Sequence, residues 1–178
     1  MHIGQPSRTA LSAATHRATH QVLEGGRLFK DPMAVRVLGI EADVLRREAE
    51  AAPDRRRMRW FIAARTRFAE DALADAFNHG VLQLVILGAG LDTYAYRGPL
   101  REQLRIFEVD HPATQSWKQR QLEAAHIRAP ATLTYAPIDF ERDTLANGLA
   151  AAGFDATEPT FFMWLGVVPY LSADAIFD

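Results

Sequence analysis

A glycine turn with an acidic residue farther along the chain is the part of the sequence best suited to chemistry. The apolar run Leu82–Leu87 stops at Gly88, Ala89 and Gly90, where a backbone without Cβ lets a ligand approach closely. Asp110 stands about 20 positions beyond Gly88, the spacing at which an acid meets ribose hydroxyls in nucleotide-binding α/β folds. A carboxylate can accept hydrogen bonds from both hydroxyls. The pattern predicts a nucleotide-shaped pocket.

Other interpretations of these residues stay open. The dinucleotide fingerprint has a third glycine where this chain has Thr93, which argues against a bound pyrophosphate and favours a nucleoside without phosphates. A tight strand-to-helix turn without a ligand explains the glycines equally simply. Asp110 is also placed to cap a helix beginning near His111–Pro112, and both roles can coexist. Glu108 competes with Asp110, but Asp110 lies nearer the carboxyl end of the strand, where ligands bind.

Two further charged residues are candidates for ligand contact. Arg65 stands between Phe61 and Phe68 in an apolar helical stripe, where a guanidinium is costly unless it meets an anion. That anion is either a ligand or the carboxylate of a structural ion pair. Asp139 follows the expected third strand, where it either faces the ligand or caps the helix region Asp143–Ala152.

The elements that must position these residues alternate as an α/β fold requires. Helices are expected over 6–18, 32–38, 41–50, 54–79, 113–125 and 172–178, and strands over 82–87, 104–110, 133–140 and 159–171. In the second of these helices Asp31 is the expected cap and Pro32 the first helical residue. Pro137 suits an edge strand. We therefore expect a single domain over residues 1–178, with a helical cap over 1–53 and a cofactor-binding half over 54–178.

Composition excludes several classes of function. The chain has 178 residues, a formal net charge of -2 and no cysteine, so a disulfide framework, a thiolate metal site and a cysteine nucleophile are ruled out. The six histidines lack metal-ligand spacing, and no metal is predicted. Arg55, Arg56 and Arg57 are interpreted as a solvated face, since a net acidic chain does not favour nucleic acid. No apolar run approaches the roughly 18 residues of a membrane span, and we expect a soluble, cytoplasmic protein with no membrane partner.

The residues resemble the leucine carboxyl methyltransferase family and its bacterial relatives, which are S-adenosylmethionine-dependent O-methyltransferases. The segments that carry the resemblance, in this order, are Ser7–Ala10, Lys30–Ala34, Arg65–Phe68, Leu87–Arg97, Phe107–Pro112, Pro137–Phe140 and Trp164–Leu171. Together they cover nearly the whole chain, and ordered motifs are far more specific than one glycine turn. The resemblance implies a class I methyltransferase fold with a Rossmann-like parallel sheet, and S-adenosyl-L-methionine as cofactor.

The resemblance also assigns roles. The implied cofactor site consists of Arg65, Gly88, Ala89, Gly90, Asp110, Asp139 and Phe140. Arg65 would bind the carboxylate of the cofactor's methionine portion, and Asp110 its ribose. Asp139 and Phe140 would flank the adenine. The implied reaction is methylation of a carboxylate or hydroxyl on a small molecule or peptide, and no catalytic residue is assigned.

The sequence departs from the family pattern in two ways. Members close to the eukaryotic enzyme carry a glutamate where this chain has Leu165, so one polar cofactor contact is missing or comes from elsewhere. The family sheet has seven strands, and this sequence stops after the fourth, so we expect a truncated domain with the first four or so strands. A minimal member that covers its exposed sheet edge by homo-oligomerisation is the alternative. A noncatalytic binding or assembly domain is the alternative function, and a nicotinamide oxidoreductase is disfavoured by Thr93.

Overall fold

The computed structural model describes residues 7–170, 172 and 173, which form an α/β domain. Its helices are α1 (Arg8–Glu24), α2 (Ala34–Leu38), α3 (Ala42–Ala51), α4 (Arg56–Asn78), α5 (Tyr94–Arg97), α6 (Pro112–Ala124) and α7 (Leu145–Ala151). Its strands are β1 (Gln83–Leu87), β2 (Arg105–Asp110), β3 (Leu133–Pro137) and β4 (Thr160–Trp164), and two 3₁₀ turns are η1 (Pro53–Arg55) and η2 (Val168–Tyr170). The helix expected over 172–178 falls largely outside the described residues.

The four strands form one parallel sheet in the order β3-β2-β1-β4. In its register Leu84 lies opposite Ile106 on β2 and opposite Phe161 on β4. Every residue of β1 is buried, because this strand has a neighbour on each side and helices over the sheet. The parallel α/β architecture expected from the sequence is confirmed, and β3, which ends at Pro137, is an edge strand as predicted.

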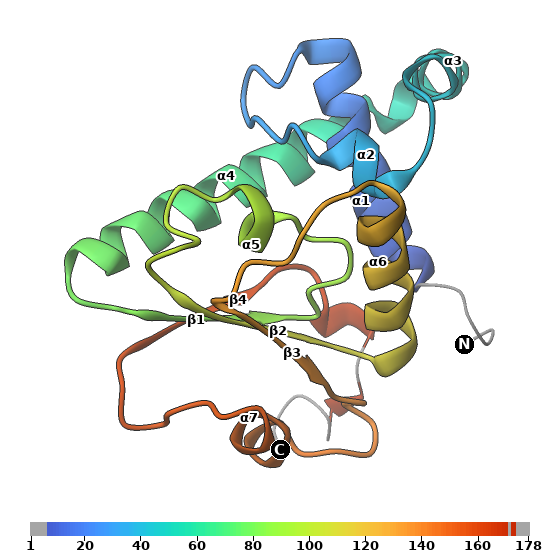
Figure 1. Cartoon of the computed structure of the whole chain (residues 1–178). Coiled ribbons are helices and arrows are strands. Elements are labelled where there is room, and N and C mark those ends of the chain that lie inside the picture. Colours follow the sequence, from blue (N-terminus) through green and yellow to red (C-terminus); the bar gives the residue numbers. More distant parts are fainter. Residues whose placement is uncertain (1–6, 171, 174–178) are drawn as a thin grey trace.

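Helices cover the two faces of the sheet unequally (Figure 1). The helices α4, α5 and α6 lie over one face, where Leu84, Ile86 and Ile106 form a buried cluster. The opposite face carries α7, beside a second cluster that includes Val85 and Phe107. Successive strand residues thus alternate between two cores, as the pleat requires.

The N-terminal helices form a layer of their own against α4 and the glycine turn. Ser7 caps α1 by accepting a hydrogen bond from the backbone N–H of Ala10, and Gly25 ends the helix in the left-handed conformation at φ 60°. Leu91, the residue after the glycine turn, is buried in a cluster with Ala14 and Ala18 of α1. The helical cap is therefore in direct contact with the turn that the sequence marks as a ligand site.

The expected start of α2 is wrong by two residues. Pro32 was expected as the first helical residue, but it lies in a turn and the helix begins at Ala34. Asp31 Oδ1 accepts from the backbone N–H of Met33 at 3.1 Å, while its Oδ2 accepts from the hydroxyl of Thr93 at 2.6 Å. The second bond holds Asp31 in the core, so a side chain expected only as a cap also belongs to a buried polar cluster.

The buried face of α4 matches the predicted apolar stripe only in part, at Ile62, Ala69 and Leu73. Phe61 and Phe68 are 58% and 76% exposed, so the part of the stripe in which Arg65 was placed is not buried. The buried residues are Arg59, Ile62, Ala63, Thr66, Ala69 and Leu73. Arg59 turns this face toward α1, because its guanidinium pairs with Glu24 at 2.7 Å. Within the described residues, no helix has the length and apolar character needed to cross a membrane.

Candidate functional site

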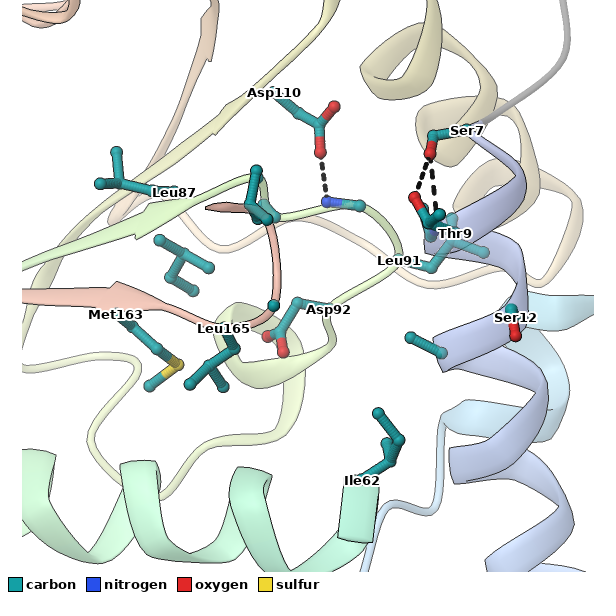
Figure 2. A pocket seen from close by; sticks show the side chains of 18 of the residues that line it. Ser7, Thr9, Ser12, Ile62, Leu87, Leu91, Asp92, Asp110, Met163 and Leu165 are labelled. Carbon is teal, nitrogen blue, oxygen red and sulfur yellow. Dashed lines mark hydrogen bonds between the residues drawn. The ribbon is translucent and has the colours of Figure 1, made fainter. Parts of the chain in front are cut away.

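A cavity of about 700 Å³ lies at the carboxyl ends of the strands. Its walls come from α1, α4, the turn after β1, the ends of β2 and β4, and the loop after β3 (Figure 2). Open parallel sheets bind ligands at this edge, and the volume is in the range of small-molecule sites. All seven residues of the predicted cofactor site line this cavity: Arg65, Gly88, Ala89, Gly90, Asp110, Asp139 and Phe140.

The glycine turn fits tightly between two other segments. Gly88 and Gly90 have φ of 61° and 51°, a conformation that side chains rarely adopt. A Cβ on Gly88 would lie 2.3 Å from Val167 Cγ2, and one on Gly90 would lie 3.0 Å from Ala10 Cβ. Packing within the protein therefore requires both glycines. The ligand-free interpretation accounts for this, but it does not account for the cavity that the turn lines.

Asp110 holds the glycine turn against the end of β2. Its Oδ2 accepts a hydrogen bond from the backbone N–H of Gly90 at 2.5 Å (Figure 2). Its Oδ1 accepts from the backbone N–H of His111 at 2.7 Å. Each oxygen keeps a second lone pair for a hydroxyl donor. Burial raises the pKa of Asp110, while the two backbone N–H groups oppose that rise. Contact between Asp110 and a ribose fits this geometry and stays a prediction.

The expectation that Asp110 caps α6 is wrong. The capping residue is His111, whose Nδ1 accepts from the backbone N–H of Ala113 at 3.1 Å. Glu108, the other acid of β2, is fully buried, and its Oε2 lies 2.6 Å from Lys118 Nζ. Burial raises the pKa of Glu108 to about 7, although Lys118 opposes the rise. Glu108 is not a cavity residue, so Asp110 is the acid of β2 that a ligand can reach.

Asp139 belongs to the turn after β3 and does not cap α7. Its Oδ1 accepts from the backbone N–H of Glu141 at 3.2 Å, whereas Thr144 caps α7. The capping alternative for Asp139 is therefore wrong. Its Oδ2 lies 3.7 Å from His111 Nε2, and Phe140 packs on the second core cluster beside it. An adenine contact of Asp139 and Phe140 stays a prediction.

Arg65 points its guanidinium along the cavity wall formed by the loop after β4. A Cβ on Gly166 would lie 2.3 Å from Arg65 Nη1, so only glycine leaves room for the guanidinium there. The Arg65 Cζ atom lies 5.9 Å from the centre of the Phe61 ring. The predicted contact between Arg65 and a ligand carboxylate is compatible with this position and stays a prediction.

Several cavity residues were not predicted. Asp92 lines the cavity two residues after Gly90, and its place close to the two glycines is a signal that the sequence contains. Helix α1 contributes the hydroxyl side chains of Thr9 and Ser12 (Figure 2) and the charged side chain of Arg17. Their role could not be found from the sequence because α1 reaches the cavity only through its packing on α4 and Leu91.

The polar and apolar groups that line the cavity fit a nucleoside joined to an amino acid. Asp110 offers lone pairs to hydroxyl groups, Arg65 offers a guanidinium to a carboxylate, and Met163 and Leu165 provide an apolar wall. The turn after β1, the acid after β2 and the cavity at the carboxyl edge of the parallel sheet define an α/β domain of the class I methyltransferase type.

Comparison with known proteins identifies the family. The family model described as leucine carboxyl methyltransferase matches residues 10–178, and the chain belongs to this family. A protein of Mycobacteroides abscessus is 36% identical over 177 residues, which cover 96% of this chain and 58% of that protein. SCO7813 of Streptomyces coelicolor is 36% identical over 182 residues (97% and 63%), and YktD of Bacillus subtilis is 42% identical over 112 residues (62% and 36%). All three carry the provisional name of an S-adenosyl-L-methionine-dependent methyltransferase, and the chain spans less than two thirds of their length.

Proposed function

We propose that this chain binds S-adenosyl-L-methionine and belongs to an enzyme that transfers the methyl group to an oxygen atom of a small molecule or peptide. The observation that carries the proposal is the cavity of about 700 Å³ at the carboxyl edge of the sheet. The glycine turn, Asp110, Asp139 and Arg65 all line it. The names of the relatives support the choice of cofactor. A carboxylate or a hydroxyl is the proposed acceptor group.

Three polar side chains would each bind a different part of the cofactor. Arg65 would hold the methionine carboxylate, since a guanidinium and a carboxylate form two parallel hydrogen bonds. Asp110 would accept from the ribose hydroxyls while it keeps Gly90 in place. Asp139 would accept from the exocyclic amine of the adenine, beside the ring of Phe140.

The protein's share of the reaction is alignment and exclusion of water. The bound cofactor would supply an electrophilic methyl group, which an acceptor oxygen would attack in line as the methyl–sulfur bond breaks and S-adenosylhomocysteine leaves. Met163 and Leu165 give the cavity an apolar wall that keeps water away from the reacting atoms. A carboxylate acceptor needs no general base, and we assign none. The cytoplasmic location expected from the sequence also stays a prediction.

Transfer of a labelled methyl group tests the oxygen acceptor. The chain is incubated with S-adenosylmethionine tritiated on the methyl group and a panel of small carboxylic acids and hydroxyl compounds. We expect label in an acceptor, and mild alkali separates the two oxygen classes because methyl esters release methanol and methyl ethers do not. Label attached to nitrogen, sulfur or carbon would contradict the proposal. Cofactor binding without transfer to any compound would favour the noncatalytic alternative.

A further inference from the structure

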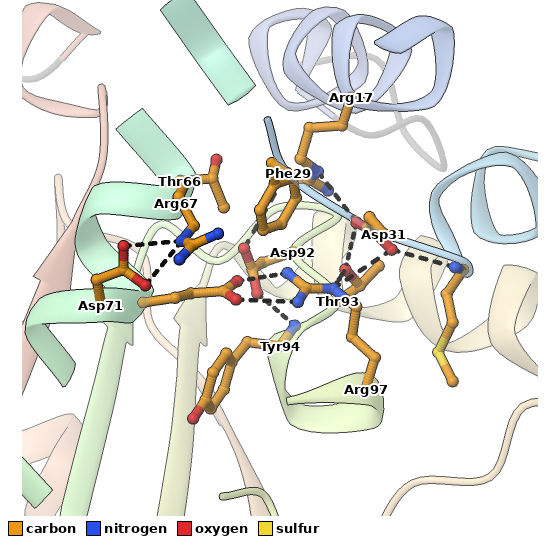
Figure 3. Close-up of polar contacts among 12 residues, drawn as sticks. Arg17, Phe29, Asp31, Thr66, Arg67, Asp71, Asp92, Thr93, Tyr94 and Arg97 are labelled. Atoms are coloured by element: carbon orange, nitrogen blue, oxygen red, sulfur yellow. Dashed lines mark hydrogen bonds and ion pairs between the residues drawn. The ribbon is translucent and has the colours of Figure 1, made fainter. Parts of the chain in front are cut away.

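A cluster of buried charges lies behind the glycine turn and joins four segments of the chain (Figure 3). Arg97 of α5 makes two hydrogen bonds to Glu70 of α4, at 2.5 and 3.0 Å, and its Nε lies 3.4 Å from Asp31. Arg17 of α1 lies 3.6 Å from Asp31, and its Nη2 donates to the carbonyl oxygen of Leu91. These contacts tie the helical cap to the glycine turn.

The charges of this cluster do not balance. Its described members are two guanidinium groups, Arg17 and Arg97, and three carboxylates, Asp31, Glu70 and Asp92. With all five groups ionised the cluster carries one surplus negative charge, and burial raises the pKa of Glu70. A buried charge is costly unless it is paired, so a surplus carboxylate favours a position where a cation can reach it.

The neighbouring buried lysine has a carboxylate partner of its own. Lys118 Nζ lies 2.6 Å from Glu108 Oε2, and both side chains are 1% exposed. The charge of Lys118 also helps to lower the pKa of Asp92. Neither Lys118 nor Glu108 lines the cavity, so a ligand does not reach this pair directly.

Asp92 is the carboxylate of the cluster that faces the cavity. Its Oδ1 accepts from the backbone N–H of Tyr94 at 2.7 Å, and its Oδ2 lies 3.8 Å from Arg17 Nη1, the longest ion pair of the cluster. Asp31 and Glu70 are held by shorter contacts and do not line the cavity. Of the three carboxylates of the cluster, Asp92 is thus the one that presents its charge to the cavity, where it points inward (Figure 2).

The carboxylate of Asp92 is ionised in the folded protein. Burial alone would raise its pKa, but Arg17, Arg97, Lys118 and the backbone N–H of Tyr94 together outweigh burial, and the pKa lies below its ordinary value. Asp92 therefore offers a negative charge to the cavity.

We propose that Asp92 recognises the positive charge of the cofactor's sulfonium, and that it makes the cavity selective for S-adenosylmethionine over S-adenosylhomocysteine. This inference rests on the proposed function. The two nucleosides share the adenine, the ribose and the amino acid, and they differ in the methyl group and its charge. The ionised carboxylate of Asp92 would attract the positive charge of the methyl donor's sulfonium, whereas the neutral sulfur of the product offers it no charge. Selective binding of this kind promotes exchange of product for fresh cofactor.

Titration calorimetry of the 178-residue chain with three probes tests this role. The probes are S-adenosylmethionine, S-adenosylhomocysteine and sinefungin, an unreactive analogue with a cationic amine in place of the methyl sulfonium. In Asp92→Asn an amide oxygen can still accept from Tyr94, so mainly the charge is lost. We expect the two cationic probes to bind about tenfold more weakly, and S-adenosylhomocysteine to change by less than about threefold. The exposed Asp71→Asn on α4 is the matched control and should leave all three affinities unchanged.

Two results overturn the role of Asp92 and leave the proposed function intact. One is an equal loss of affinity for all three probes, which indicates a structural role or a contact with the shared ammonium group. The other is no loss for any probe in a folded Asp92→Asn variant. Failure of the unmodified chain to bind any of the three overturns the proposed function itself.

A measurement on the unmodified chain keeps the test decisive if Asp92→Asn does not fold. The two cationic probes should bind more tightly than S-adenosylhomocysteine. An unmodified chain that binds S-adenosylhomocysteine as tightly as it binds the two cationic probes contradicts the proposal.

Discussion

The backbone N–H of Gly90 donates a hydrogen bond to Asp110 Oδ2 over 2.5 Å, which joins the turn after β1 to the end of β2. One carboxylate therefore both shapes the glycine turn and faces the cavity. The sequence left two interpretations of Asp110 open, capping of α6 and contact with a ribose. Capping of α6 belongs to His111, and contact with a ribose is the role that remains to be tested.

Replacement of Asp110 tests the ribose contact. We expect Asp110→Asn to weaken S-adenosylmethionine, S-adenosylhomocysteine and adenosine alike, by about 1–3 kcal/mol, because all three contain the ribose. Competition titrations measure the three affinities under one set of conditions. A loss confined to one of these ligands would contradict the assignment.

Replacement of Arg65 separates the amino acid end of the cofactor from the nucleoside end. We expect Arg65→Ala to weaken S-adenosylmethionine by about 2–5 kcal/mol, through loss of a desolvated charge pair, and to leave adenosine unaffected. Arg67→Ala is the matched control, since Arg67 lies on the same helix but is exposed and pairs with Asp71. The assignment fails if a folded Arg65→Ala variant binds S-adenosylmethionine normally, or if adenosine is lost equally.

The glycine turn gives a prediction about stability. Gly88→Ala should lower the free energy of unfolding by about 2–4 kcal/mol, because it adds a clash with Val167 to the strain of a positive φ. Gly153 has a φ of 79° with open space around it, so Gly153→Ala measures the strain alone, and we expect about 1–2 kcal/mol. Chemical denaturation of both variants gives the comparison. Equal losses would show that contact with Val167 does not matter.

The buried pair of Glu108 and Lys118 predicts a pH dependence of stability. Burial raises the pKa of Glu108 to about 7 in the folded chain, above its unfolded value of about 4.3. Between these values the folded chain binds the proton more readily, so the contribution of Glu108 to stability is lost as pH rises toward 7. We expect the free energy of unfolding to fall by roughly 1–3 kcal/mol from this group between pH 5 and pH 8.

Urea denaturation at several pH values, compared between the unmodified chain and Glu108→Gln, isolates this contribution. The glutamine does not titrate, so the difference in unfolding free energy between the two proteins should change with pH in that direction. A pH-independent difference would show that Lys118 keeps Glu108 ionised throughout.

From the exposed edge strand β4 we expect two copies of the chain to associate. Within the described residues β4 pairs only with β1, the segment Thr160–Trp164 carries no charge, and Phe162 is 48% exposed. We propose that a second copy of the chain covers this edge. Sedimentation should give a dimer that Phe162→Lys weakens, and a monomeric unmodified chain at high concentration would contradict the proposal.

The sequence predicted the fold and the members of the cavity better than it predicted individual contacts. Apolar runs that end at glycine or acid gave the parallel strands, and the carboxyl edge of the sheet then brought Asp110 and Asp139 together. The buried face of α4 was misjudged because Phe61 and Phe68 look like core residues, whereas a distant partner, Glu24, decides which side of the helix is buried.

The charge cluster could not be predicted for the same reason. Arg17, Asp31 and Arg97 are far apart in the sequence, and their pairing depends on how α1 and α4 pack around the glycine turn. The local pattern at Asp31 indicated only a helix cap, which describes one of its two oxygens. Asp92 had a local signal, its place after the glycine turn, but the charge surplus that singles it out is a property of the folded chain.

Binding of the methyl donor is the central claim, and calorimetric titration of the 178-residue chain with S-adenosylmethionine, with NAD as the comparison, tests it most directly. The account predicts saturable binding of one S-adenosylmethionine per chain and no binding of NAD, because the cavity lacks the third glycine of the pyrophosphate fingerprint. A folded chain that binds neither ligand, or that prefers NAD, would contradict it.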